Sequence, residues 1–299
     1  MSYYSGTAND MSALRAALVA ACTSEGWSWN SSTQEISKGA VVVQVQVLAE
    51  HLSFVGRVSS GSSNVSAPVK MGRLSTAAAW VLSWPMAYHV FVFASEVYLV
   101  ANYDVDKYLW AAFGATTVGG LPGVGTWLGA NAADTINAGA SPIGMTAQIG
   151  PGGAALCPGL FHANNFQGSF ARNCWIHHNL EGYGWFWGGL AGGNPVGIPQ
   201  ITTLLALLPN NWNSEAVLLP LRAFVARPSN KISMVADCEH ARITRIDNYT
   251  PGQIITLGSD RWMILPWYRK NSSSRDGSTT GSGIDHTGTM GWAIRYEGP

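Results

Sequence analysis

The sequence predicts an α+β protein that is mostly β, with an N-terminal helix and antiparallel sheet, a Gly- and aromatic-rich loop insertion, and a C-terminal antiparallel β module (a sheet or a small sandwich). Three observations carry this prediction. A stripe of apolar residues with helical spacing lies near the N-terminus, β-prone runs alternate with turn residues toward both ends, and a long glycine-rich stretch between them has neither pattern. The expected regions are therefore residues 1–113, 114–213 and 214–299.

The composition indicates a folded chain with a surface poor in charge. The 299 residues include 17 basic and 17 acidic side chains, and charged residues make up 11% of the sequence, against roughly 25% in ordinary soluble domains. Hydrophobic residues make up 47% of it, which is too many for disorder. Zero net charge argues against nucleic-acid binding, and no apolar run approaches the roughly 18 residues of a membrane helix. A surface with few charges promotes self-association, so we expect an obligate homo-oligomer.

The N-terminal region is predicted from its spacing. Residues 10–25 form a helix, because Leu14, Leu18 and Cys22 share one face, Asp10 can cap the first turn and Gly26 can end the last. Residues 34–49 are predicted to form one strand, possibly bent at Lys38–Gly39. The Gly/Ser-rich segment 56–68 is expected to be mobile unless a neighbour holds it. A hairpin over 86–103 turns near 94–96, and a short helix is expected at 106–114.

The middle of the chain changes in composition. Residues 114–200 contain 20 of the 34 glycines, nine large aromatic side chains and only three charges, Asp134, Arg172 and Glu181. We expect a loop-rich insertion that packs on another surface, because interface cores are depleted in charge and enriched in aromatic residues. Residues 199–208 are predicted to form a short helix with Pro199 in its first turn.

From residue 214 the pattern becomes regular again. Six short β-prone runs are expected to form an antiparallel module: 216–227, 231–237, 241–247, 253–257, 261–268 and 290–296. In the fifth run Trp262 and Ile264 would face one way, and Met263, Leu265 and Trp267 the other. A strand that is apolar on both faces is covered on both faces.

Candidate chemical sites are weak. There is no nucleophile elbow and no phosphate-binding loop. The cluster Cys157, His162, Cys174, His177 and His178 has a spacing that matches no standard zinc module, and the thiols, Cys238 among them, are expected to be reduced and buried. The acids Asp134, Glu181 and Glu215 lie near aromatic residues as in glycosidase clefts, but such an enzyme needs two carboxylates across the sugar, and the sequence does not place any two of these acids opposite each other; structural acids are the default interpretation. We therefore expect no enzyme, no metal and no cofactor.

Six segments of the chain share one resemblance: YYSGTAN with the helix ending EGW (3–27), EISKGAVVVQV (35–45), residues 84–114, WNSEAVLLPLRAFVAR (212–227), residues 242–271 and HTGTMGWAIRY (286–296). They resemble an uncharacterised family of virion structural proteins of tailed bacteriophages. The resemblance covers somewhat over half of the chain, at both ends and in the predicted hairpin. It implies a component of the phage tail or of the head–tail neck, and it supplies no site residues.

Together these observations favour a structural subunit that forms a homo-oligomeric ring in the neck or tail, as a collar, connector or tail terminator. Such a subunit would be assembled in the host bacterial cytoplasm, would reside in the virion, and would bind other tail or neck proteins rather than a membrane or a specific nucleic-acid sequence. The alternatives are a baseplate or host-recognition adhesin with a sugar-binding aromatic face and, third, a lytic glycosidase. The expected interface residues are Trp127, Phe170, Trp175, Tyr183, Trp185, Phe186, Trp187, Arg269 and Lys270.

Overall fold

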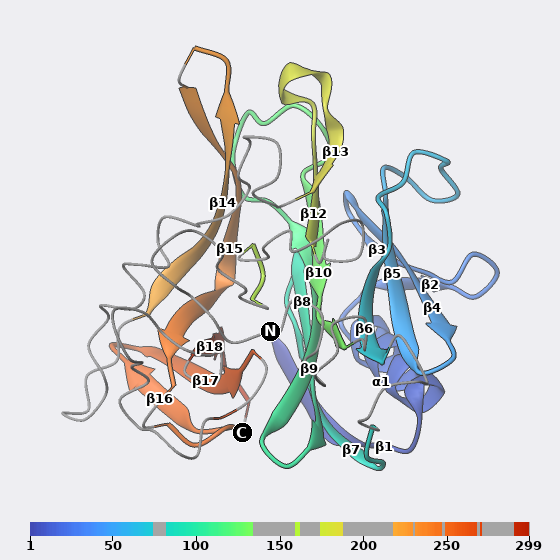
Figure 1. The fold of residues 1–299 in the computed structure, drawn as a ribbon, viewed down its shortest axis with the longest axis vertical. Coiled ribbons are helices and arrows are strands. Elements are labelled where there is room, and N and C mark those ends of the chain that lie inside the picture. Colours follow the sequence, from blue (N-terminus) through green and yellow to red (C-terminus); the bar gives the residue numbers. More distant parts are fainter. Residues whose placement is uncertain are drawn as a thin grey trace, which may run out of the picture.

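The protein is built of three stacked β layers, seen edge-on in Figure 1 of the computed structural model. A seven-stranded central sheet lies between a six-stranded N-terminal sheet with one helix and a five-stranded C-terminal sheet. The structure describes residues 1–73, 82–133, 159–161, 174–187, 218–229, 231–246, 249–267, 270 and 290–298. The expectation of an α+β, mostly β protein is confirmed.

The central sheet is antiparallel throughout and has the strand order β1-β7-β8-β9-β10-β12-β13. Its strands are β1 (Ser2–Ala8), β7 (Met86–Val92), β8 (Glu96–Asp104), β9 (Lys107–Ala115), β10 (Thr126–Ala130), β12 (Cys174–His178) and β13 (Gly184–Trp187).

The two outer sheets differ in where their strands come from. The N-terminal sheet has the order β11-β6-β5-β4-β3-β2, and the C-terminal sheet has the order β14-β15-β18-β17-β16. The first consists of β2 (Ser28–Asn30), β3 (Glu35–Lys38), β4 (Val41–Leu48), β5 (His51–Arg57), β6 (Val69–Arg73) and β11 (Ala132–Ala133), and the second of β14 (Leu219–Arg227), β15 (Lys231–Arg245), β16 (Ile254–Leu257), β17 (Asp260–Pro266) and β18 (Met290–Arg295).

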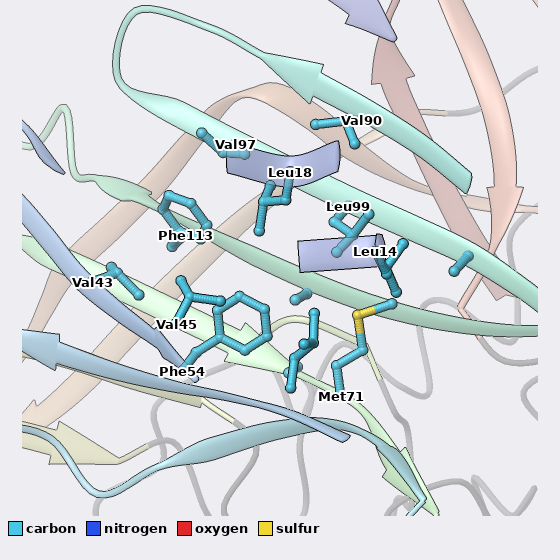
Figure 2. Packing of buried hydrophobic residues seen from close by; sticks show 14 of the residues in the cluster. Leu14, Leu18, Val43, Val45, Phe54, Met71, Val90, Val97, Leu99 and Phe113 are labelled. Atoms are coloured by element: carbon cyan, nitrogen blue, oxygen red, sulfur yellow. The ribbon is translucent and has the colours of Figure 1, made fainter. Parts of the chain in front are cut away.

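Residues along the central strands alternate between two cores. In β8, Val97 and Leu99 contact the N-terminal layer, while Tyr98 and Val100 contact the C-terminal layer. Figure 2 shows the first of these cores, where side chains of the helix and the N-terminal sheet meet those of β7, β8 and β9. Because both faces are covered, the middle strands of this sheet are apolar on both faces.

The second core is dominated by indole rings. Trp292 of β18 lies edge-on to Trp110 of β9 at 5.2 Å between ring centroids, and to Trp267 at 5.9 Å. Trp127 of β10 and Tyr98 complete the cluster, and all of these rings are buried. Large offset and edge-to-face aromatic pairs of this kind provide the buried area that joins the central and C-terminal sheets.

The helix and the first long hairpin are as predicted. Helix α1 spans Met11–Ser24, Asp10 accepts a hydrogen bond from the Ala13 amide at 2.7 Å, and Gly26 adopts a positive φ after the helix. Strands β7 and β8 form the hairpin expected at 86–103.

Two predictions of single elements are wrong. Residues 34–49 form two strands, β3 and β4, that pair with each other across a turn at Gly39–Ala40. The segment 106–114, predicted as a short helix, is strand β9: its alternate residues contact opposite cores, so its sequence is a continuous apolar run without strand alternation.

In the C-terminal module, the expected runs 231–237 and 241–247 are one long strand, β15.

The expected insertion is in part an extension of the central sheet. Strands β10, β12 and β13 come from residues 114–213 and continue the sheet begun by residues 1–113. The boundary expected at 113/114 lies inside β9. The helix expected at 199–208 lies outside the described residues.

The segment 56–68 is held by its own chain. Glu35, which is 1% exposed, accepts hydrogen bonds from the Ser60 hydroxyl at 2.6 Å and the Gly61 amide at 3.2 Å, and pairs with Arg57 at 3.0 Å. Burial raises the pKa of Glu35, but these donors and Arg57 outweigh it and leave the pKa below its ordinary value. The prediction that a neighbour is needed to hold this loop is therefore not supported at its Ser60–Gly61 tip.

The C-terminal hairpin β16–β17 confirms the predicted two-faced strand. Trp262 and Ile264 belong to a small cluster on the outer side of the sheet, whereas Met263 and Leu265 face the central sheet. No helix in the described part of the chain is long and apolar enough to cross a membrane.

Candidate functional site

Two of the expected interface aromatics lie in the interior. Trp127 is fully buried in the core between the central and C-terminal sheets, and Trp175 of β12 is 7% exposed against the N-terminal layer. Because both rings lie in strands that are covered on both faces, they have almost no surface free for a partner in the described structure. Sequence composition alone does not separate a buried aromatic residue from one that contacts a partner.

Three further aromatics of this group, Tyr183, Trp185 and Phe186, lie at the β13 edge of the central sheet. Tyr183 is 44% exposed, and Trp185 and Phe186 are half-buried. The Trp185 ring covers Gly56 of β5, where a Cβ atom would lie 2.4 Å from it, so this indole is already used within the chain. Trp187 belongs to β13 and its side chain lies outside the described residues, as do Phe170 and Arg269.

Lys270 makes its described contacts inside the chain. Its amide donates to the Asp106 carbonyl at 2.9 Å, and its ammonium group donates to the Ile246 carbonyl. The first bond links the segment after β17 to the β8–β9 turn, and the second links it to the residue that follows β15, so the described contacts of Lys270 are structural contacts within one copy.

The feature that projects furthest is the hairpin β14–β15, whose tip lies at the same end of the molecule as the β12–β13 hairpin (Figure 1). We call residues 225–233 of this hairpin the hairpin arm. Near its base, Val225 and Val235 are buried, but Ile232 on the arm is 74% exposed. Ile232 therefore exposes an apolar side chain to solvent near the tip of this hairpin.

An ion pair fixes the arm to the neighbouring hairpin. The Arg227 guanidinium donates two hydrogen bonds to one oxygen of Glu181, at 2.7 and 2.9 Å. Glu181 lies in the short 3-10 turn η1 (Leu180–Gly182) between β12 and β13, with a positive φ of 56°. Arg227 also donates to the Ser233 hydroxyl at 3.3 Å, so one guanidinium joins both strands of the arm to the turn beside Tyr183.

The histidines of the expected zinc cluster have other surroundings. His177 Nδ1 accepts a hydrogen bond from the Val124 amide at 3.1 Å, and its ring lies edge-on to Trp185. His178 has no exposed surface, lies beside Phe186 and Tyr183, and has a pKa lowered to about 4, chiefly by burial and then by His177. Cys157 and His162 lie outside the described residues; within those residues no group of three or more His, Cys, Asp or Glu side chains is placed to hold a metal ion.

A buried polar cluster that the sequence did not indicate joins β8 to β15. The Glu96 carboxylate has no exposed surface and accepts hydrogen bonds from the Glu239 amide at 2.8 Å and the His240 amide at 3.0 Å. His240 Nδ1 lies 2.9 Å from the same carboxylate, and the Tyr98 hydroxyl donates to it at 3.0 Å. Burial and nearby Glu96 raise the pKa of the Cys238 thiol well above its ordinary value, so that thiol stays protonated and is a poor nucleophile.

The cluster therefore connects two layers. Its donors come from a bend of β15, where Arg242 Nη1 donates to the carbonyls of Cys238 and Glu239 at 2.9 Å. The segment Asp237–His240, expected at a strand end, lies instead in the middle of β15. Glu96 could have been noticed only as an acid in a hairpin turn, and nothing in the sequence shows that its partners are 144 residues away.

No protein-family model matches the chain, and no curated protein matches it in sequence. The use of the hairpin arm is therefore inferred from its own residues.

Proposed function

We propose that this chain is a structural subunit of a tailed bacteriophage virion, in which copies form a homo-oligomeric ring in the neck or tail as a collar, connector or tail terminator. The observation that supports it best is the hairpin arm. A ring closes through contacts in which one surface of a copy meets a different surface of the next. An arm that projects beyond the layers, with Ile232 exposed on it, is suited to such a contact.

The energetics of the arm agree with this role. Fully burying an Ile side chain contributes roughly 1.5–3 kcal/mol. The Arg227–Glu181 pair holds the arm before any partner arrives, so little conformational freedom is lost on contact. In the ring, Ile232 would be buried against an apolar surface of the adjacent copy.

The charges of the chain also support close assembly. Part of the charge on the described residues is neutralised in ion pairs within one copy, which lowers the electrostatic repulsion between copies. These pairs are Arg57–Glu35, Arg73–Glu50, Lys107–Asp104, Arg222–Asp237, Arg227–Glu181 and Arg295–Asp260.

The adhesin alternative gains little from the described residues. A sugar-binding face needs several exposed rings on which sugars can stack. Among the described aromatic side chains only Tyr183 is exposed, and the others, Trp127 and Trp175 among them, are buried or half-buried. A glycan array with the purified protein would test this alternative directly.

The ring is tested by native mass spectrometry and negative-stain electron microscopy of the purified protein. We expect a ring of identical copies, and we expect Ile232→Asp to reduce the mass to that of a smaller species. The matched control is Val105→Asp, which changes a residue that is 82% exposed in the β8–β9 turn, at the opposite end of the molecule (Figure 1). A wild-type protein that is monomeric at all concentrations, or equal loss of the ring in both variants, would contradict the proposed role of the arm.

A further inference from the structure

Strand β1 forms one edge of the central sheet, and no strand among the described residues pairs with its outer side. In the part of the chain that the structure describes, β1 pairs with β7 only, in unbroken register from Ser2–Val92 to Ala8–Met86. Ser5, Gly6 and Thr7 are exposed. Every second residue of such a strand turns its amide and carbonyl groups away from the sheet, so β1 presents a row of backbone groups that a further strand could pair with.

This edge lacks the features that normally prevent pairing. Natural edge strands are protected by charged residues, by proline, by bulges or by being very short. The sequence of β1, SYYSGTA, has no charge and no proline, spans seven residues and makes no bulge against β7. An unprotected edge of this length is a pairing site for another β-strand.

The aromatic side chains of β1 are turned toward their own chain and leave the edge free. The Tyr3 hydroxyl lies 2.7 Å from His89 Nδ1, and the Tyr3 ring packs against Phe91 and Tyr296. The Tyr4 hydroxyl donates to Glu25 at 2.6 Å. Both rings are thus fixed over the two faces of the sheet rather than beyond its edge.

The strand directions indicate which strand can pair with β1. Seven strands that alternate in direction leave β1 and β13, the two edges, running the same way. Pairing β13 of one copy with β1 of the next in a continuous sheet would thus be parallel, and β13 has only four residues, with Trp185 and Phe186 half-buried. Pairing β1 with β1 about a two-fold axis is antiparallel and can use all seven residues, which favours it.

We propose that β1 pairs with β1 of a second copy of this chain, antiparallel and centred on Ser5, so that two central sheets become one continuous sheet. In this register Ser5 faces its own counterpart, Tyr4 faces Gly6 and Tyr3 faces Thr7. Each tyrosine meets a small side chain on the same face of the sheet, and no like charges are opposed. This contact deepens the homo-oligomer of the proposed function: a two-fold contact alone cannot close a ring, so ring closure stays with the hairpin arm.

A charge-reversal pair at Ser5 tests the contact. Ser5→Lys places two lysines directly opposite each other, and Ser5→Glu does the same with two carboxylates, so each variant should have half the mass of the wild-type assembly by light scattering. An equimolar mixture of the two variants should restore the wild-type mass, because Lys then faces Glu. The control is Ser59→Lys, at another exposed serine in the 58–64 loop, which should keep the wild-type mass.

A cysteine test measures the register itself. Under mild oxidation Ser5→Cys should yield a disulfide-linked dimer on a non-reducing gel, because directly opposed Cα atoms of an antiparallel pair lie about 4.5–5.5 Å apart, within the range that a disulfide spans. Thr7→Cys, opposite Tyr3, should give no more linked dimer than the wild-type protein, whose described cysteines, Cys22, Cys174 and Cys238, are buried.

The outcomes separate this inference from the proposed ring. If both Ser5 charge variants keep the wild-type oligomeric mass while Ile232→Asp lowers it, the β1 pairing is wrong and the ring remains supported. If each Ser5 charge variant by itself has a lower mass and the equimolar mixture of Ser5→Lys and Ser5→Glu restores the wild-type mass, the two-fold contact is supported even if no ring forms. A cross-link in Thr7→Cys but not in Ser5→Cys would overturn the proposed register.

Discussion

Glu96 places a fully buried carboxylate at the junction of the central and C-terminal sheets, where two amides, a hydroxyl and an imidazole nitrogen surround it. Such a group stabilises the fold only while all its partners are present, because an uncompensated buried polar group costs far more than one hydrogen bond returns. In a chain with few charges, the position of this carboxylate therefore specifies how two layers dock.

Removing the Glu96 carboxylate should cost much of the stability of the fold. Glu96→Ala removes the acceptor of the Glu239 and His240 amides and of the buried Tyr98 hydroxyl, and we expect the free energy of unfolding to fall by roughly 3–5 kcal/mol. Asp260→Ala is the matched control, since that carboxylate is 38% exposed in its pair with Arg295 and should matter by about 1 kcal/mol or less. Urea unfolding of both variants measures the difference, and equal losses would contradict the docking role.

His178 should make the protein sensitive to mild acid. Its pKa is about 4 in the folded chain, below the ordinary 6.5, so the unfolded chain binds a proton first and stability falls as the pH drops from 6.5 to 4. The full loss for one group is on the order of 3 kcal/mol. In His178→Phe, which keeps the ring contacts, the loss between pH 7 and pH 4 should be smaller by that amount in urea unfolding. An unchanged pH dependence would show that His178 takes up its proton without penalty.

At the scale of single elements, spacing predicts those with one apolar face. Helix α1 is predictable because its buried residues lie on one side and Asp10 caps it. Strand β9 is not, because Leu109 and Trp110 face two different cores, and a strand buried on both sides has the same composition as a short buried helix. The turn at Gly39–Ala40 is hidden in the same way, since a hairpin and a bent strand share one alternating pattern.

The candidate site follows the same division. The sequence indicated that the aromatic region 114–200 matters for packing, but it could not separate the buried Trp127 from the exposed Tyr183, because both are large rings among glycines. Ile232 and Arg227 were not singled out because their significance depends on a hairpin that projects, which is a property of the fold.

The C-terminal hairpin gives a prediction at this scale. Trp262 is 6% exposed and packs in one cluster with Ile264 and Tyr249, and the Arg242 guanidinium lies 5.3 Å from the centre of its ring. Trp262→Ala should lower the free energy of unfolding by about 3–5 kcal/mol and the melting temperature with it. Leu257→Ala in the paired strand, at 39% exposure, should change little. A thermally silent Trp262→Ala would mean that the outer cluster does not stabilise the sheet.

At the scale of the molecule, the three layers depend on each other. Both faces of the central sheet are covered by another layer. Leu99 and Phe113 pack against the N-terminal layer, and Trp110 and Trp127 pack against the C-terminal layer. The class of the fold is predictable from composition and turns, but the layering is not, because β1 pairs with β7 and β8 meets β15 across long stretches of sequence.

A chain that ends at residue 213 should therefore fail to stay soluble. It would lack the C-terminal sheet and expose Tyr98, Trp110 and Trp127 on one face of the central sheet. We expect aggregation, or strong binding of a hydrophobic dye to whatever remains in solution, compared with the full chain. A soluble truncated protein with a cooperative thermal transition would show that residues 1–213 form an independent domain.

The order of the strands along the chain also bears on synthesis. During synthesis, β1 cannot pair until β7 has left the ribosome. The indole-rich face of the central sheet stays uncovered until β18, near the end of the chain, has been made. Contacts between such distant segments slow folding and lengthen the time during which apolar surface is exposed. The yield of folded protein in a cell thus depends on whether the last strand is completed before the exposed apolar surface aggregates. Chaperones that bind this surface during synthesis would raise that yield.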